Sequence, residues 1–389
     1  MKIANRMENL SPSVTMAITA LARELKAQGK DILSFSAGEP DFDTPQVIKD
    51  AAIQAIQDGH TKYTAVEGTE ETKKAIIGKL QKDHGLEYQM DEIIVSNGAK
   101  HSLFNLFQCL IEEGDEVIIP APYWVTYPEQ VKFSDGVPVF IDTDDSTNFK
   151  ITAEQLKAAI TPKTRVLLLN TPSNPTGGVY TKEELESLGE VLKGTDILVF
   201  SDEMYEKIMY DNKPFTAVAS VSDDMFQRTV TINGISKAVA MTGWRYGYIA
   251  TPNKALIKSM IKLQGQVTSN VNSVTLQAAV TALDGSADAD IEMMRKEFEK
   301  RRNIVVDGFN AIDGLSCVVP DGAFYVFVNI KNVTTDSMKF AADLLEEQGV
   351  AVVPGLAFGT EGYFRFSFAT DETTIKAGIS RIKSFVEKN

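Results

Sequence analysis

Cysteine and histidine are scarce in this chain of 389 residues. The two cysteines, Cys109 and Cys317, lie far apart and have the spacing of neither a zinc site nor a disulfide framework. The three histidines, His60, His84 and His101, share no motif with a nucleophile or with a pair of carboxylates. We therefore predict no metal site, and we assign proton transfer to a residue type other than histidine.

Long apolar runs and an excess of basic residues are also lacking. No segment reaches the length that spans a bilayer, and residues 1–10 contain no apolar stretch or cleavage site typical of a signal peptide. The net charge of −14 and the pI of about 4.9 disfavour nonspecific binding to nucleic acid or to an anionic membrane, because both would repel an acidic surface. We predict a cytoplasmic protein whose partners are small molecules, with no nucleic acid or membrane among them.

The pattern of the chain predicts an α/β protein with two domains. Alternating apolar strands and amphipathic helices fill residues 45–285, which is typical of a mostly parallel sheet with crossover helices. Residues 286–389 predict a smaller α+β domain that begins with a long charged helix at 291–311. Its expected strands are 323–328, 350–354 and 363–368.

The most informative segment contains Ser236-Lys237 and, shortly after it, Gly243-Trp244-Arg245. A lysine at a strand end with an arginine eight residues on suits an amine that forms an imine beside a cation that holds a phosphate. Pyridoxal 5′-phosphate supplies both the aldehyde and the phosphate. A lone lysine is more often a solvated surface charge, so other segments must decide between the two interpretations.

A carboxylate closes the apolar run at residues 197–200. This run predicts a buried parallel strand that delivers Asp202 to its carboxyl end, where α/β sheets bind ligands. The protonated pyridine nitrogen of the cofactor would give the buried carboxylate its cationic partner. For Asp202 taken alone, the cap of a helix is the commoner explanation.

A second apolar run, residues 165–170, leads into a loop rich in proline and glycine. Asn174 precedes Pro175, which pushes its backbone out of the helical region and leaves its amide free to donate to the phenolic oxygen of a bound pyridoxal. Tyr205 could donate to the same oxygen. An Asn-Pro turn without a ligand is the alternative.

A third strand, residues 92–96, feeds a loop of small residues and then an apolar helix. Free backbone amides at a helix N-terminus bind anions, so Gly98, Ala99 and Lys100 are placed to hold the phosphate that Arg245 also binds. No G-x-G-x-x-G or Walker A motif accompanies them, which argues against a dinucleotide or nucleoside triphosphate.

Together these motifs resemble those of a class I aminotransferase of the pyridoxal-phosphate fold type I superfamily, and the match runs nearly end to end. Within the family the sequence is most similar to the bacterial aspartate aminotransferase branch. The motifs are Ala37-Gly38-Glu39-Pro40-Asp41-Phe42, Lys62-Tyr63-Thr64, Pro122-Tyr123-Trp124-Val125, Asn174-Pro175-Thr176-Gly177, Ser201-Asp202-Glu203, Ser236-Lys237, Arg245 and Phe364-Arg365-Phe366-Ser367.

The resemblance implies a seven-stranded sheet between helices in the large domain, and residues 1–44 packed on the small one. It also implies a homodimer with shared active sites. Catalysis would fall to Lys237, as the imine-forming lysine and proton carrier, with Asp202 and Tyr205. The implied cofactor-binding residues are Gly98, Ala99, Lys100, Trp124, Asn174, Asp202, Tyr205, Ser236, Lys237, Arg245 and, from the partner subunit, Tyr63.

For the substrate, the resemblance implies that Arg365 binds the α-carboxylate with the Gly38 amide beside it, near Trp124 and Asn174. Residues 265–270 contain no arginine for a second carboxylate. The implied substitute is Lys100, accompanied by the hydroxyl residues Ser13 and Thr15. Gly234 stands where many members carry a phosphate-binding serine, so the phosphate would depend more on Arg245 and Tyr63.

The leading hypothesis is transfer of the amino group from L-aspartate to 2-oxoglutarate. One alternative is another donor, such as an aromatic amino acid, prephenate/arogenate or an N-acyl-diaminopimelate. A β-eliminating lyase on the same fold is a third hypothesis, and a ligand-sensing module of a regulator is the most distant, because the chain leaves no room for a DNA-binding domain.

Overall fold

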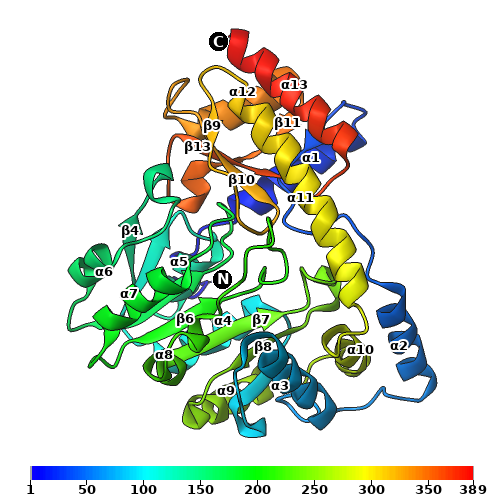
Figure 1. The fold of residues 1–389 in the computed structure, drawn as a ribbon, viewed down its shortest axis with the longest axis vertical. Helices are drawn as coiled ribbons and strands as arrows, with labels where there is room; N and C mark the ends of the chain where they lie inside the picture. Colours follow the sequence, from blue (N-terminus) through cyan, green and yellow to red (C-terminus); the bar gives the residue numbers. More distant parts are fainter. Residues whose placement is uncertain (1, 389) are drawn as a thin grey trace.

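A seven-stranded sheet forms the centre of the larger part of the computed structural model, which describes residues 2–388 (Figure 1). Its strands follow the order β2-β8-β7-β6-β5-β3-β4. All run parallel except β8, which is antiparallel to both of its neighbours. The predicted mostly parallel sheet is therefore confirmed. The bounds are β2 (Ile93–Ser96), β3 (Glu116–Ala121), β4 (Val137–Asp142), β5 (Thr164–Asn170), β6 (Leu198–Asp202), β7 (Thr229–Gly234) and β8 (Gly247–Ala250).

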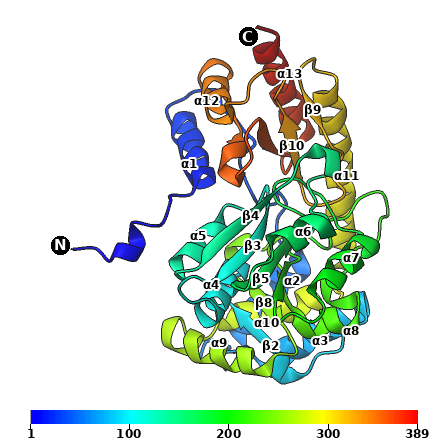
Figure 2. The ribbon, with the colours of Figure 1, turned by 90° about the vertical axis from the view of Figure 1, so that its left-hand side faces the viewer.

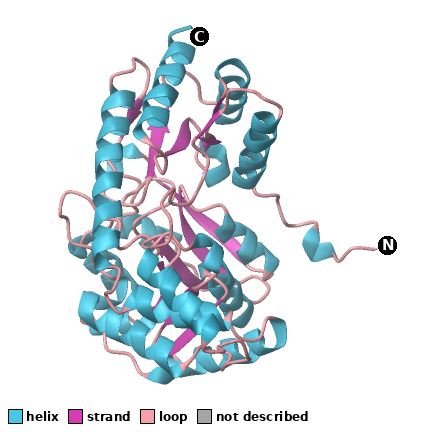
Figure 3. Cartoon of the chain, turned by 90° about the vertical axis from the view of Figure 1, so that its right-hand side faces the viewer, coloured by secondary structure: helices cyan, strands magenta, loops and turns pink. Residues whose placement is uncertain are grey.

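Helices cover both faces of this sheet, as Figure 3 shows. Successive strand residues point to opposite faces, so Ile94 and Leu168 pack on one side while Val95 and Leu167 pack on the other. Such strands read as continuous apolar runs, which is why the sequence revealed them. The helices are α2 (Gln46–Gln57), α3 (Glu70–His84), α4 (Ala99–Leu110), α5 (Thr126–Phe133), α6 (Ala153–Ala159), α7 (Lys182–Leu192), α8 (Asp223–Arg228), α9 (Lys254–Val267) and α10 (Ser273–Leu283).

The remainder of the chain forms a smaller α+β part above the large sheet (Figure 1). Its antiparallel sheet has the order β12-β13-β10-β9, and three helices pack against it through aromatic and aliphatic side chains. The elements are α11 (Asp288–Asn310), β9 (Ser316–Cys317), β10 (Tyr325–Asn329), α12 (Ser337–Gln348), β11 (Val350–Ala351), β12 (Val353–Pro354), β13 (Tyr363–Ser367) and α13 (Glu372–Lys388).

The N-terminal segment lies against this smaller part. It contains α1 (Val14–Ala27) and β1 (Leu33–Ser34), and β1 pairs in parallel with β11. Residues 2–12 extend away from α1 and the smaller part (Figure 2), and the Ser11 amide donates to Glu129 of α5 at 2.6 Å. The domain limits 1–44, 45–285 and 286–389 remain predictions, and their outermost residues, Met1 and Asn389, lie outside the described chain. Short 3-10 helices are η1 (Asn5–Met7), η2 (Met90–Glu92), η3 (Asp145–Thr147), η4 (Val218–Ser220), η5 (Thr242–Trp244) and η6 (Gly355–Phe358).

Within residues 2–388, no helix has the length and apolar character needed to cross a membrane.

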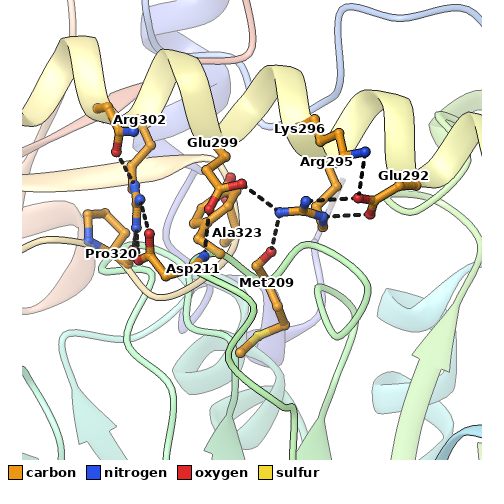
Figure 4. Close-up of polar contacts among 11 residues, drawn as sticks. Met209, Asp211, Glu292, Arg295, Lys296, Glu299, Arg302, Pro320 and Ala323 are labelled. Carbon is orange, nitrogen blue, oxygen red and sulfur yellow. Dashed lines mark hydrogen bonds and ion pairs between the residues drawn. The ribbon is translucent and has the colours of Figure 1, made fainter.

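Helix α11 ties the segment that follows β6 to the smaller part (Figure 4). Arg302 donates to both carboxylate oxygens of Asp211, over 2.6 and 2.8 Å, and to the Pro320 carbonyl at 3.1 Å. About two turns earlier, Arg295 donates to the Met209 carbonyl at 3.2 Å. The segment that follows the carboxyl end of β6 is therefore bound to α11.

A buried ion pair holds the same segment from the side of the large sheet. The Glu206 carboxylate accepts a hydrogen bond from the ammonium of Lys79 in α3, and it lies 2.5 Å from His84 Nε2. The side chains of Lys79 and Glu206 are 7% and 5% exposed. A buried charge without its partner is strongly unfavourable, so this contact anchors α3 to the strand end.

Glu206→Gln should lower the free energy of unfolding by about 3 kcal/mol, because the buried Lys79 ammonium would lose its nearest counter-charge and keep only the Asp83 carboxylate, 3.6 Å away. Urea denaturation of the cofactor-free protein measures this change. Glu70→Gln is the matched control, since it breaks an exposed ion pair with Lys74 and should alter stability little. Equal effects of the two variants would show that the buried pair has no special structural role.

Candidate active site

The candidate site lies where the carboxyl ends of the parallel strands meet. Asn170, the last residue of β5, pairs with Asp202, the last residue of β6. The reversed direction of β8 matters here, because its first residue, Gly247, pairs with Ser96 of β2 and Gly234 of β7. Arg245, two residues before β8, therefore reaches the same edge as the ends of the other strands. The structure thus brings together the three segments that the sequence singled out.

Asp202 lies at the bottom of this site. Its carboxylate is buried and accepts hydrogen bonds from the Tyr127 hydroxyl at 2.8 Å and the Met204 amide at 3.3 Å. Burial raises the pKa of Asp202 to about 6, although both hydrogen bonds oppose the shift. A cationic partner would stabilise the ionised form, and a protonated pyridine nitrogen has the required charge.

Lys237 follows the end of β7, and its amine donates to the Gly38 carbonyl. Burial lowers the pKa of this amine to about 8; Glu39 opposes the shift, and Arg365 and Arg245 add to it. A lysine in such surroundings loses its proton readily, which is the condition for attack on an aldehyde.

The loop before α4 and Arg245 form a site for an anion. The Arg245 guanidinium donates to the Thr242 carbonyl at 2.7 Å, and a Cβ added to Gly98 would lie 2.4 Å from Arg245 Nη2. Glycine at position 98, with φ +88°, is therefore what lets the arginine approach the start of the helix. The Gly98 amide already donates to the Ser96 carbonyl at 2.7 Å. The amides that begin α4, those of Ala99 and Lys100, have no partner inside the helix.

The close approach of two strands explains the glycine at position 234. A Cβ there would lie 2.7 Å from the Tyr246 carbonyl and 3.0 Å from the Gly247 Cα. A serine does not fit at this position without moving β8. Ser236, two residues further on, is buried at the sheet edge beside Lys237.

Arg365 lies at the opposite end of the site, on β13. Its side chain is 2% exposed and donates to Asn174 Oδ1 at 2.9 Å and to the Ser36 carbonyl at 2.7 Å. Its Nε has no acceptor, and burial lowers the pKa of the guanidinium. A buried cation whose hydrogen bonds reach only uncharged oxygens calls for an anion. A substrate carboxylate would provide that anion.

Lys100 and Trp124 approach each other between these two ends. The Lys100 ammonium lies 4.9 Å from the centre of the Trp124 ring, and Trp124 packs edge-on against Tyr127. Burial and, after it, the charge of Arg245 lower the pKa of Lys100. Lys100 is an exposed cation near a second cation, Arg245, and this pair favours a bound anion between them.

Three predicted residues are not joined to the rest of the site within this chain. Ser13 caps α1 by accepting from the Met16 amide at 3.4 Å, and it lines a cavity of about 580 Å³ beside α5. Among residues 2–388, no hydrogen bond connects the side chains of Ser13 or Thr15 to Lys100. Tyr63 is 89% exposed. Their proposed roles remain predictions.

The sequence reasoning missed two tyrosines and a histidine. Tyr127 binds Asp202 and lies one helical turn after Trp124, a spacing that could have indicated a shared face. Tyr325 binds the Tyr205 hydroxyl at 2.9 Å, and no local pattern announces it. His84 belongs with Asp83 and Glu206 to a group that could ligate a metal, but Lys79 and Lys207 already pair with its carboxylates.

Comparison with known proteins places this geometry in a family. The model of the aminotransferases of class I and II matches residues 30–382. The chain belongs to this family. It is 49% identical to an aspartate aminotransferase of Geobacillus stearothermophilus, over 100% of this chain and 99% of the relative. It is 47% identical to an aspartate/prephenate aminotransferase of Nitrosomonas europaea, over 99% of this chain and 100% of the relative.

Solved aminotransferase structures confirm the fold type. The aspartate aminotransferase of Rhizobium meliloti superposes with a TM-score of 0.96 at 45% identity, covering 100% of this chain and 99% of that one. The aspartate aminotransferase of Thermus thermophilus with maleate superposes with a TM-score of 0.95 at 40% identity and covers 99% of both chains. This aminotransferase is therefore an α/β enzyme of fold type I, from a family that depends on pyridoxal phosphate.

The residues at the sheet edge fit that cofactor. A buried carboxylate, a desolvated lysine and an arginine beside free helix amides provide groups for the ring nitrogen, the aldehyde and the phosphate. Asn174 directs its carbonyl oxygen to Arg365, which leaves its amide nitrogen free to donate elsewhere.

Uptake of pyridoxal phosphate by the cofactor-free protein should accelerate as the pH rises through about 8. The pKa of Lys237 is lowered, so the uncharged and nucleophilic amine predominates above pH 8 instead of above its ordinary value. Stopped-flow absorbance between pH 6.5 and 10 measures the rate. A rate that is flat up to pH 9 and rises only near the ordinary lysine pKa would contradict the assignment.

Proposed function

We propose that this aminotransferase moves the amino group of L-aspartate to 2-oxoglutarate in a ping-pong reaction that gives oxaloacetate and L-glutamate. The observation that carries the proposal is Arg365, a buried guanidinium with no carboxylate partner among residues 2–388. Lys100 is a second cation without a carboxylate partner in that range, and it lies exposed near the Arg245 end. A dicarboxylic substrate has one carboxylate for each of these two cations. The names of several relatives and the maleate in the Thermus structure support a dicarboxylate.

The cofactor, when bound, supplies an aldehyde carbon and an electron-withdrawing ring. Lys237 would hold the cofactor at that carbon, and its amine would move the proton of the substrate Cα, because its pKa near 8 lets it act as a base near neutral pH. Asp202 keeps the ring nitrogen protonated, and the Tyr127 hydroxyl orients the Asp202 carboxylate.

Residues at the two ends of the site orient the substrate. Arg365 binds the α-carboxylate through its planar fork, and Asn174 and the Ser36 carbonyl hold the guanidinium in place. The side-chain carboxylate approaches Lys100, whose ammonium lies over Trp124. Burial of Arg365 excludes water from the end of the site that would hold the α-carboxylate and strengthens that interaction.

Prephenate/arogenate is a second candidate substrate pair, in which arogenate has the amino group to donate and prephenate, a keto acid, would accept it. Lys100 is a point charge on a flexible stem, so it accommodates carboxylates at more than one position, unlike the planar fork of an arginine. The name of the Nitrosomonas relative supports this alternative. No contact in the structure favours β-elimination.

Lys100→Gln should lower kcat/KM for L-aspartate about 30-fold or more and that for L-phenylalanine only a few-fold, because only the first substrate has a second carboxylate to leave unpaired. Steady-state kinetics with 2-oxoglutarate as acceptor measure both. Lys132→Gln, on the half-exposed face of α5, is the control. Equal losses for the two substrates would remove Lys100 from the specificity pocket.

We also propose a homodimer in which Tyr63 reaches the phosphate of the partner subunit. Its 89% exposure leaves the hydroxyl free for such a contact.

Tyr63→Phe should speed dissociation of pyridoxal phosphate about tenfold, since one hydrogen bond to a charged phosphate is lost. Dialysis followed by absorbance measures the loss. Tyr88→Phe, which removes a buried hydroxyl in the core of the large part, should leave retention unchanged. If both variants retained the cofactor equally, Tyr63 would have no phosphate role.

A further inference from the structure

Tyr325 is a buried side chain that touches both ends of the candidate site. Its hydroxyl lies 2.9 Å from the Tyr205 hydroxyl, and its ring centre lies 4.4 Å from the guanidinium carbon of Arg365. A Cβ added to Gly38 would lie 3.3 Å from the same hydroxyl. One residue therefore contacts the proposed carboxylate-binding arginine, the proposed phenol-binding tyrosine and the glycine beside them.

The register of the small sheet produces this arrangement. Arg365 on β13 pairs with Phe327 on β10, and Tyr325 lies two residues before Phe327 on the same strand. Side chains two residues apart on a strand share a face, so Tyr325 is the diagonal neighbour of Arg365. Its ring is consequently a flat support beneath the guanidinium.

The contact with Tyr205 crosses from the small sheet to the large one. Tyr205 follows the end of β6, and the two tyrosine rings meet edge-on with centres 5.8 Å apart. Among residues 2–388, the Tyr205 hydroxyl has this one hydrogen-bond partner. A hydroxyl has one proton and two lone pairs, so Tyr205 can donate to a cofactor oxygen while it accepts from Tyr325.

We propose that Tyr325 is a positioning residue that couples the arginine holding the substrate carboxylate to the tyrosine holding the phenolic oxygen of the cofactor. Its ring supports the Arg365 guanidinium. Its hydroxyl donates to the Tyr205 hydroxyl, so that the proton of the Tyr205 hydroxyl is free to point to the cofactor. The inference rests on the proposed use of pyridoxal phosphate at this site, and it extends that proposal to a residue that would act through Arg365 and Tyr205.

The coupling has a spectroscopic consequence. Hydrogen bonds in a chain polarise one another, so losing the Tyr325 hydroxyl weakens the bond that Tyr205 donates. More negative charge then stays on the phenolic oxygen, and it holds the proton on the Lys237 nitrogen of the loaded enzyme more tightly. The pKa read from the absorption of the bound cofactor should rise.

The test is a pH titration of the absorption spectrum of the loaded enzyme without any amino acid. Tyr325→Phe should raise the spectroscopic pKa by about 0.5–1 unit, the shift expected from one hydrogen bond. In a Tyr205→Phe background the same change should add nothing, because the pathway through Tyr205 is already absent. Tyr363→Phe is the control: this tyrosine is also buried in the small sheet, but its hydroxyl binds Lys331.

Kinetics separate the two halves of the role. Tyr325→Phe keeps the ring and should change KM for L-aspartate by less than about threefold, whereas Tyr325→Leu removes the support of Arg365 and should raise KM about tenfold. An unmoved spectroscopic pKa in Tyr325→Phe, or equal shifts in the presence and absence of the Tyr205 hydroxyl, would overturn the inference alone. A wild-type protein that never shows a band of bound cofactor would overturn the proposed function and the inference with it.

Discussion

Arg365 is a guanidinium buried in the protein without a carboxylate to neutralise it. Its hydrogen bonds reach the Asn174 side chain and the Ser36 carbonyl, and its Nε reaches nothing among residues 2–388. Burying a charge without a counter-charge lowers the stability of the fold. Carboxylates are plentiful in this chain of net charge −14, so a nearby carboxylate could have removed that cost. An anionic substrate would supply the negative charge that the surroundings of Arg365 lack. The fold around the site serves to keep this cation dry, oriented and unpaired.

The other cations of the site also lack a carboxylate partner among residues 2–388, although Arg245 and Lys100 are exposed. The hydrogen bonds of Lys237 and Arg245 also go to uncharged oxygens, and Lys100 lies over an aromatic ring. The reversed strand β8 brings Arg245 to the edge where the parallel strands end, and Gly98 gives it room. Asp202 is the opposite case, a buried carboxylate without a cation. Each of these charges therefore lacks an oppositely charged partner among residues 2–388.

Much of this was predictable from the sequence because strands buried on both faces read as short apolar runs that end in polar residues. The strand ends at Ser96, Asn170 and Asp202 were visible in this way. Lys237, which follows the end of β7, was also identified from the sequence. Contacts made across long separations were not visible. Tyr325 contacts Tyr205, which lies 120 residues away in the sequence, and it contacts Arg365 because of the register between β10 and β13. Neither contact produces a local pattern in the sequence. The Gly98 amide was predicted as a phosphate donor, but it is engaged by the Ser96 carbonyl, a turn that periodicity does not reveal.

The most direct test of the account is the absorption spectrum of the purified, cofactor-loaded protein during titration with L-aspartate, then separately with L-alanine and L-phenylalanine. We predict that low concentrations of L-aspartate convert the band of Lys237-bound cofactor into that of the aminated cofactor, while the other two act only at much higher concentration. Conversion by a neutral amino acid at equal or lower concentration would contradict the claim that the unpaired cations are placed for a dicarboxylate.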